Sequence, residues 1–352
     1  MSLTQQTPKQ PVTIVDLPVE LIQRIFCWID PHRVWRLRRI SSAIYACITT
    51  VAFARLNLHT MGAPNVTEFE SWDATGLDYL GWTGPRIYRI VYFQDYVAHL
   101  KVISWGADEQ GVDVPETTIY LDKRIPIQLS SLNNLEKLIL VDCDLKGVIP
   151  SEIGALASLM QLDLRANHLE GDIPATFEGL KNLRILSLAD NELSGRIPPE
   201  LGNLSQLETL ILLGNRELSG PLPAELSRLS NLKYLDISKT AVYGPIPPEW
   251  GYLANLNYLT LYENPNLGCI IPPEFGNLVN LIELDISGSN MVGPIPSELG
   301  RLANLVQLFL ESNNLSGAVP IELAELELLE VCDLRGNPLL TCSFEFERAN
   351  LD

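Results

Sequence analysis

The side chains that most often carry out catalysis or bind metals are spread thinly along this 352-residue chain. Its four histidines, His32, His59, His99 and His168, lie far apart in the sequence. No glycine-rich phosphate loop, nucleophile elbow or cluster with the spacing of zinc ligands occurs. The six cysteines are also widely separated, and we interpret most of them as small buried hydrophobes. The sequence therefore predicts a protein without catalytic site, metal or cofactor.

Carboxylates are plentiful, and three of them recur at the same place in a repeated pattern, at Asp163, Asp236 and Asp285. A carboxylate that acts as a general acid or base needs a positioned substrate proton and a shifted pKa. Because each of these aspartates recurs at a fixed place in the repeat, we interpret them as solvated surface acids.

The pattern that positions these aspartates is a repeat of 24 or 25 residues. Nine units open on a leucine in the same register, at Leu135, Leu159, Leu183, Leu207, Leu232, Leu256, Leu281, Leu305 and Leu329. In the third unit, Leu186 and Leu188 alternate with Ser187 and Ala189, which predicts a short strand with the leucines pointing inward and the small residues outward. One unit cannot bury its leucine face alone. Stacked parallel units close a continuous core, so we expect a solenoid.

An asparagine recurs where the chain leaves each predicted strand, at Asn167, Asn191, Asn215, Asn264, Asn313 and Asn337. A buried amide there can satisfy backbone groups that a tight coil leaves unpaired. Cys143, Thr240 and Ser289 replace it in three coils, where we predict local gaps or ordered water and the softest coils. Downstream in the third unit, Gly195 is expected to form the bend, Ile197 to enter the core and Pro198 to precede a short convex helix.

The consensus LxxLxLxxNxLSGxIPxxLGxL resembles the plant-type leucine-rich repeat of receptor ectodomains and polygalacturonase-inhibiting proteins. This resemblance implies an α/β solenoid over residues 132–342, with parallel strands lining a concave face. Residues 61–131 resemble a degenerate N-terminal cap of such a solenoid, and we interpret residues 343–352 as a C-terminal tail or cap.

Residues 11–58 do not follow the repeat. Leu21, Ile22 and Ile25 have helical spacing, and the Asp30-Pro31 pair is typical of a helix start, so three short helices are predicted. The segment DLPVELIQRIFCWIDPHRVWRLRRI resembles an F-box. The resemblance implies apolar contacts with a Skp-type adaptor of a cullin-RING ubiquitin ligase, made by Leu17, Pro18, Leu21, Ile22, Ile25, Phe26, Ile29, Pro31 and Leu37. The alternative is that this module only caps the open end of the solenoid.

A protein partner is expected on the concave face, where outward positions of four consecutive coils combine aromatic rings with carboxylates. These positions are Tyr234, Asp236, Tyr258, Tyr262, Glu263, Glu283, Asp285, Phe309 and Glu311. Aromatic side chains offer large contact area, and a negative rim suits a basic partner. Equally, aromatic residues are simply good strand formers. A second candidate surface on the first coils contains Lys137, Arg165, Ile211 and Leu213.

The formal net charge of -18 makes nucleic acid and anionic membranes poor partners. The N-terminal residues lack the apolar stretch of a signal peptide, and no run of about 18 apolar residues occurs, so we expect a cytoplasmic or nuclear protein. The function we predict is substrate recognition within a ubiquitin ligase. The alternative is a scaffold, or a receptor-like or inhibitor-like repeat module without a ligase link. The glycosylation sequons at Asn203 and Asn314 matter only if the module is extracellular.

Overall fold

The computed structural model describes residues 53–54, 100–106 and 124–343. Of two compact units in the chain, the second, Glu70–Trp72 with His99–Asp352, holds nearly all of these residues. Apart from residues 53–54, the predicted helical module at 11–58 lies outside the described residues, as do most of the predicted cap and residues 344–352. The fold described below is that of residues 100–106 and 124–343.

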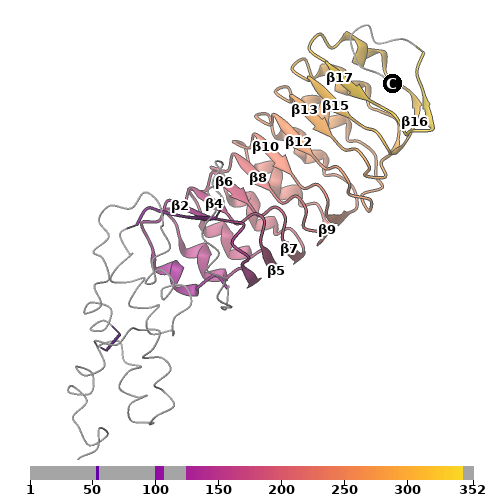
Figure 1. The fold of residues 1–352 in the computed structure, drawn as a ribbon. Helices are drawn as coiled ribbons and strands as arrows, with labels where there is room; N and C mark the ends of the chain where they lie inside the picture. The colour runs from indigo at the N-terminus through magenta and orange to yellow at the C-terminus, as the bar shows by residue number, and fades with distance from the viewer. Residues whose placement is uncertain (1–52, 55–99, 107–123, 344–352) are drawn as a thin grey trace, which may run out of the picture. The chain divides into compact units, whose positions relative to one another are not determined.

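A ten-stranded parallel sheet runs along the stacked repeats (Figure 1). In spatial order its strands are β1 (Val102–Gly106), β2 (Lys137–Val141), β4 (Gln161–Asp163), β6 (Ile185–Ser187), β8 (Thr209–Ile211), β10 (Tyr234–Asp236), β12 (Tyr258–Thr260), β13 (Glu283–Asp285), β15 (Gln307–Phe309) and β17 (Val331–Asp333). The nine predicted repeats supply β2 to β17. Strand β1 adds a tenth strand from within the predicted cap, paired in register with β2.

The inward side of this sheet is the leucine core that the periodicity predicts. Leu186 and Leu188 are completely buried, and equivalent leucines are buried in every neighbouring coil. The outward direction predicted for Ser187 and Ala189 does not make them accessible, because only 3% and 5% of their surfaces are exposed. At a strand spacing of about 4.8 Å, larger outward side chains in adjacent coils can cover such small residues.

Opposite the sheet, each coil contains one short 3-10 helix, where a short convex helix was predicted. These helices are η4 (Ile127–Ser131), η5 (Ser151–Ala155), η6 (Ala175–Gly179), η7 (Pro199–Asn203), η8 (Ala224–Arg228), η9 (Pro248–Tyr252), η10 (Pro273–Asn277), η11 (Ser297–Arg301) and η12 (Ile321–Glu325). Pro198 precedes η7 in an extended conformation, as its restricted backbone predicts. Neighbouring helices stack so closely that a Cβ atom on Gly276 would lie 2.3 Å from the carbonyl oxygen of Glu298.

Between strand and helix, the coils bend through a second set of short parallel pairings, which is interrupted at the coil of β12. One group is β3 (Lys146–Val148), β5 (His168–Asp172), β7 (Glu192–Gly195), β9 (Glu217–Pro221) and β11 (Ala241–Tyr243). The other is β14 (Val292–Gly293), β16 (Asn314–Ala318) and β18 (Leu339–Thr341). Gly195 has a φ angle of +69°, which supports the bend predicted there, and Ile197 is buried in the core.

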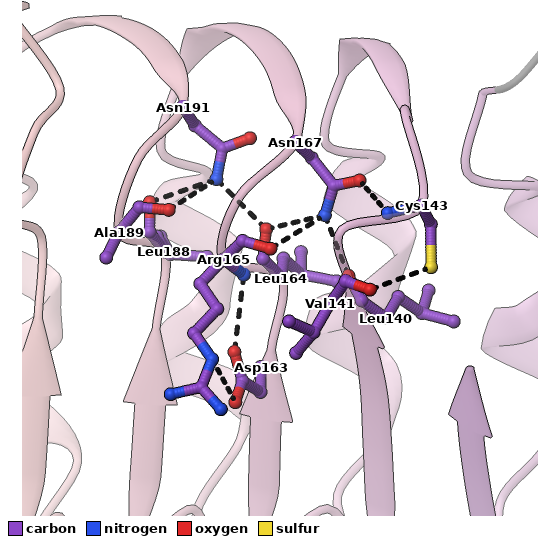
Figure 2. Close-up of polar contacts among 10 residues, drawn as sticks. All are labelled: Leu140, Val141, Cys143, Asp163, Leu164, Arg165, Asn167, Leu188, Ala189 and Asn191. Carbon is purple, nitrogen blue, oxygen red and sulfur yellow. Dashed lines mark hydrogen bonds and ion pairs between the residues drawn. The ribbon is translucent and has the colours of Figure 1, made fainter. Parts of the chain in front are cut away.

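The recurring asparagines form a buried hydrogen-bonded ladder between coils (Figure 2). The Asn191 amide donates to the carbonyl oxygen of Leu164 in the preceding coil at 2.9 Å and to Leu188 in its own coil at 3.1 Å. Its Oδ1 atom accepts a 3.0 Å hydrogen bond from the backbone N–H of Leu169. Each asparagine therefore satisfies a backbone donor that the preceding coil cannot satisfy alone, which confirms the role predicted from its spacing.

The ladder asparagine is replaced by a hydroxyl-bearing residue in the two coils that come after a longer coil. Thr240 and Ser289 each come after a 25-residue coil, in which one extra residue follows the ladder asparagine. That extra residue lets Leu218 N–H donate to the carbonyl oxygen of Asn215 at 3.0 Å, and Leu267 N–H to that of Asn264 at 3.1 Å. The next coil then needs no amide oxygen as an acceptor for this N–H group.

Both hydroxyls are hydrogen-bonded to protein atoms, where we predicted local gaps or ordered water. Thr240 donates to Asn264 Oδ1 at 2.8 Å, and Ser289 donates to the carbonyl oxygen of Leu261 at 2.6 Å. The sequence prediction considered only the size of the replacing side chain. It overlooked the change that the extra residue makes in the backbone of the preceding coil.

Candidate functional site

The outward side of the ten-stranded sheet, called the strand face below, brings the predicted partner-binding residues together. Strand register places Tyr234 beside Tyr258, and Tyr258 beside Glu283. The next outward row runs from Asp236 through Thr260 and Asp285 to Phe309. Tyr262, Glu263 and Glu311 follow directly after their strands on the same coils. Of the nine predicted residues, Glu263 is exposed, Asp236 is buried and the other seven are half-buried.

The tyrosines form the aromatic part of this surface. The rings of Tyr234 and Tyr258 lie with centroids 5.5 Å apart and planes tilted by 35°. Lys239 places its Nζ atom 5.3 Å from the centre of the Tyr262 ring and 3.8 Å from a Glu263 carboxylate oxygen. This contact within the protein shows that a cation fits against a tyrosine ring at this place.

The carboxylates beside these rings are only partly compensated. Burial raises the pKa of Glu283, and repulsion from Asp285 and Asp236 raises it further. Burial also raises the pKa of Asp285, although hydrogen bonds from Ser287 lower it. The pKa of Glu311 is raised chiefly by burial as well. Lost hydration and like charge both favour the neutral acid, so a bound cation would relieve both effects.

Two of the recurring aspartates are buried, which corrects their interpretation as solvated acids. Asp163 is 6% exposed and Asp236 is 5% exposed. The Asp236 Oδ1 atom accepts a 2.9 Å hydrogen bond from the backbone N–H of Ser238. Asp285 is half-buried and accepts bonds from the backbone and hydroxyl of Ser287, at 3.0 and 2.6 Å. A turn closed by a hydrogen bond from the residue two places later holds each carboxylate against its own coil, where neighbouring coils cover it.

A nearby arginine accompanies two strand-face aspartates. In the coil of β4, the Nε atom of Arg165 lies 3.5 Å from Asp163 Oδ2 (Figure 2). In the coil of β17, Arg335 Nε donates to both carboxylate oxygens of Asp333, at 2.9 and 3.0 Å, and lowers the pKa of Asp333. Each arginine follows its aspartate by two residues. Among the residues that the structure describes, Asp236 and Asp285 form no ion pair, because the equivalent positions hold serines.

Sequence reasoning missed Thr260, which lies between Asp236 and Asp285 in the same row. Thr260 is 5% exposed, and its Oγ1 atom has no hydrogen-bond partner within the described part of the chain. Because Leu259 and Leu261 point into the core, Thr260 faces the opposite side, toward the strand face. The signal in the sequence is that Thr260 holds the strand position that aspartates hold in the repeats before and after it.

The second candidate surface combines two exposed basic residues with two half-buried apolar ones. Ile211 and Leu213 are half-buried on and beside β8, while Lys137 is exposed on β2. Arg165 is exposed, but it is engaged with Asp163. The predicted adaptor contacts between residues 17 and 37 lie outside the described residues.

Other kinds of site find little support in residues 100–106 and 124–343. No group of three or more histidine, cysteine, aspartate or glutamate side chains is arranged there to hold a metal ion. None of the helices described has the length and apolar character needed to cross a bilayer. A cavity of about 320 Å³ lies at the C-terminal coil, lined by Val319, Leu334, Asn337 and Leu340 among others.

Leucine-rich repeats define the class of fold to which this solenoid belongs, and comparison with protein families confirms them. A leucine-rich-repeat family matches residues 133–193 and 157–216, and a second leucine-rich-repeat family matches residues 280–302. No F-box family was detected. No curated protein sequence matches the chain.

Solved structures with the same fold include several plant proteins. The ectodomain of the Arabidopsis thaliana receptor kinase GASSHO1/SCHENGEN3, in complex with CASPARIAN STRIP INTEGRITY FACTOR 2, is 36% identical with a TM-score of 0.62. That match covers 70% of this chain and 29% of the ectodomain. The Arabidopsis receptor kinase HAESA, with the peptide hormone IDA and co-receptor SERK1, is 30% identical over 71% of this chain and 42% of its own, with a TM-score of 0.58. A plant ice-binding protein is 28% identical over 65% and 69%, with a TM-score of 0.50.

This chain therefore spans less than half the length of the two receptor ectodomains. Because receptors and an ice-binding protein share the fold, the fold alone does not decide the ligand. The choice of ligand depends instead on the side chains of the strand face.

Proposed function

We propose that this chain is a non-catalytic recognition module that binds a protein or peptide across the strand face. The observation that carries the proposal is the group of half-buried aromatic side chains, Tyr234, Tyr258, Tyr262 and Phe309, on three of four consecutive coils. Large rings with few rotatable bonds supply contact area at low entropic cost. At about 4.8 Å per strand, ten strands form a face about 40 Å long, enough for about 800 Å² of contact.

The receptor structures support this proposal. GASSHO1/SCHENGEN3 and HAESA were solved in complexes with CASPARIAN STRIP INTEGRITY FACTOR 2 and the peptide hormone IDA, respectively. The shared fold makes a peptide or protein ligand a reasonable proposal for this chain too. Their kinase and co-receptor functions are not carried over, because this chain matches only a part of each ectodomain.

Selection from a displayed peptide library tests the proposal on the full chain. Peptides selected against the wild-type protein are measured again with the double variant Tyr258→Ala, Tyr262→Ala. The matched control is Tyr243→Ala, Tyr252→Ala, which removes two exposed rings from the preceding coil, away from the strand face. We expect the first variant to weaken binding at least tenfold and the control to leave it unchanged. Selected peptides that bind both variants equally would show that the strand face is not the recognition surface.

A second proposal concerns residues 11–58 and rests on their sequence alone. We propose that the segment with Leu17-Pro18 and Asp30-Pro31 docks on a Skp-type adaptor, which makes the repeats the substrate-binding part of a cytoplasmic or nuclear ubiquitin ligase. Calorimetry with purified adaptor tests it, using Ile25→Ala, Phe26→Ala against the control Ile321→Ala, Leu328→Ala on exposed repeat positions. Loss of binding in the first variant alone, with the repeats still folded, is the expected result. Absence of adaptor binding by the folded wild-type chain would overturn the proposal.

A further inference from the structure

The row Asp236, Thr260, Asp285 combines a hydroxyl without a hydrogen-bond partner and two carboxylates without an ion-pair partner among the described residues. Two carboxylates flank one buried hydroxyl on adjacent strands in register. The Thr260 Oγ1 atom has no hydrogen-bond partner in the described residues. A buried hydroxyl without a partner costs about 1–3 kcal/mol, so it calls for an explanation. Gln128 Oε1, Ser187 Oγ and Glu311 Oε2 also lack a partner in the described residues, but of these four atoms only that of Thr260 lies between two aspartates in register.

The protein itself contains the group that would complete this row. Asp163 and Asp333 occupy the same strand position as Asp236 and Asp285, and each is engaged by a guanidinium from the residue two places later. In the other two coils that residue is Ser238 or Ser287, each donating its backbone N–H to the Oδ1 atom of the carboxylate. The two unpaired aspartates are thus the ones that flank the unpartnered threonine.

Aromatic rings border the row on both sides. Tyr234 and Tyr258 lie one outward position before it along the strands, and Tyr262 lies one outward position after it. Lys239 already lies over the Tyr262 ring and beside Glu263. Thr260 therefore has carboxylates beside it across the strands and tyrosines before and after it along the strands, and together these groups favour a planar cation.

We propose that this row is the seat of an arginine side chain supplied by the bound protein or peptide. The proposal rests on the proposed function of the strand face and adds the chemistry of one contact. A guanidinium has five donors in one plane, so it can donate to Asp236 on one side, to Asp285 on the other and to the Thr260 hydroxyl beneath. Charge-assisted hydrogen bonds of about 2.8 Å on both sides can bridge carboxylates whose backbones lie about 10 Å apart, two strand spacings. A lysine ammonium is a point charge and cannot span that width.

The test uses the full chain labelled with 3-fluorotyrosine, whose 11 tyrosine resonances are assigned with single Tyr→Phe variants. The probes are acetyl-Gly-Gly-Xaa-Gly-Gly-amide peptides in which Xaa is arginine, lysine or citrulline, the uncharged analogue of arginine. We expect the arginine peptide to shift the Tyr234, Tyr258 and Tyr262 resonances in a saturable way. The lysine peptide should bind at least threefold more weakly, and the citrulline peptide at least tenfold more weakly.

Two variants connect the response to the row. Asp236→Asn, Asp285→Asn keeps the oxygen that accepts from Ser238 and Ser287, so the coils should fold while the arginine peptide loses at least tenfold in affinity. Thr260→Val removes only the hydroxyl and should cost about threefold or more. The charge-matched control is Glu225→Gln, Glu249→Gln on helices η8 and η9, away from the strand face, and it should bind like the wild-type chain.

Equal binding of arginine and citrulline peptides, or unchanged arginine binding in the double asparagine variant, would overturn the arginine seat. The library selection separates this failure from a failure of the proposed function. Selected peptides without arginine that still require Tyr258 and Tyr262 would leave the strand face as a recognition surface and remove only the arginine seat. A selection whose binders all ignore those tyrosines would overturn both.

Discussion

Replacing Asn215 with alanine tests whether the ladder residues serve the coil before them. Asn215 is fully buried, and its amide donates to the carbonyl oxygens of Leu188 and Leu212 at 3.0 and 2.8 Å. Its Oδ1 atom accepts from the N–H of Leu193 at 3.1 Å. Two lost hydrogen bonds cost about 1 kcal/mol each, and an orphaned buried N–H costs about 1–3 kcal/mol. Asn215→Ala should therefore lower the free energy of unfolding by about 3–5 kcal/mol.

The control is Thr240→Ala, at the equivalent position one coil later. The Thr240 hydroxyl donates to Asn264 Oδ1 at 2.8 Å, with the carbonyl oxygen of Ile237 as the alternative acceptor at 3.2 Å, and it accepts from the Val242 N–H at 3.5 Å. Its loss leaves the N–H of Leu218 paired with Asn215, because the preceding coil carries the extra residue. The only backbone group that loses its acceptor is the Val242 N–H, whose contact with the hydroxyl is long at 3.5 Å, so the expected cost is only about 1–2 kcal/mol.

Urea unfolding followed by circular dichroism measures both costs, with the slope of each transition checked for loss of two-state behaviour. Hydrogen exchange supplies a local readout. The amide of Leu193 should exchange much faster in Asn215→Ala, whereas that of Leu218 should stay protected in Thr240→Ala. If the two variants lose the same stability, or if the Leu193 amide stays protected without its acceptor, the link between ladder residue and coil length is refuted.

Two further predictions concern the strand face and the helix stack. Asp285→Asn should raise the melting temperature at pH 7, because burial raises the pKa of Asp285 and its ionised form therefore destabilises the folded state. That destabilisation develops as the pH rises through the raised folded pKa. The difference in melting temperature between wild type and variant should therefore vanish below about pH 4. A difference that persists or grows in acid would contradict this explanation. Gly276→Ala puts a Cβ atom 2.3 Å from the Glu298 carbonyl oxygen and should cost about 3 kcal/mol in urea unfolding. Gly244→Ala meets no atom within 4 Å and should cost about 1 kcal/mol for its left-handed backbone, so equal costs would argue against close helix stacking.

The repeat core could be predicted from the sequence because its information is local and repeated. Leu186, Leu188, Asn191 and Ile197 have the burial that their spacing predicts, and Gly195 forms the expected bend. The burial of Ser187 could not be predicted the same way. It depends on which side chains the two adjacent coils place beside it, which alternation along one strand does not contain.

The candidate site was only partly predictable for the same reason. The aromatic and acidic residues could be placed on one face, because register follows from the repeat. Thr260 was missed, since its environment is created by Asp236 and Asp285 from coils about 25 residues away on either side. The burial of Asp236 was also missed, because a carboxylate on an outward position looks solvated until neighbouring coils are stacked against it.

Departures from the repeat are of two physical kinds, and only one of them calls for a partner. Thr240 departs from the ladder, but the extra residue in the preceding coil has already satisfied the backbone group concerned. Ser238 and Ser287 depart from the arginines of the other Asp-containing coils, and no compensating cation contacts Asp236 or Asp285 among the described residues. A substitution compensated within the fold is neutral for binding. One that leaves carboxylates without a counter-ion and a buried hydroxyl without a partner lowers stability, and a ligand that supplies the missing cation recovers that free energy on binding.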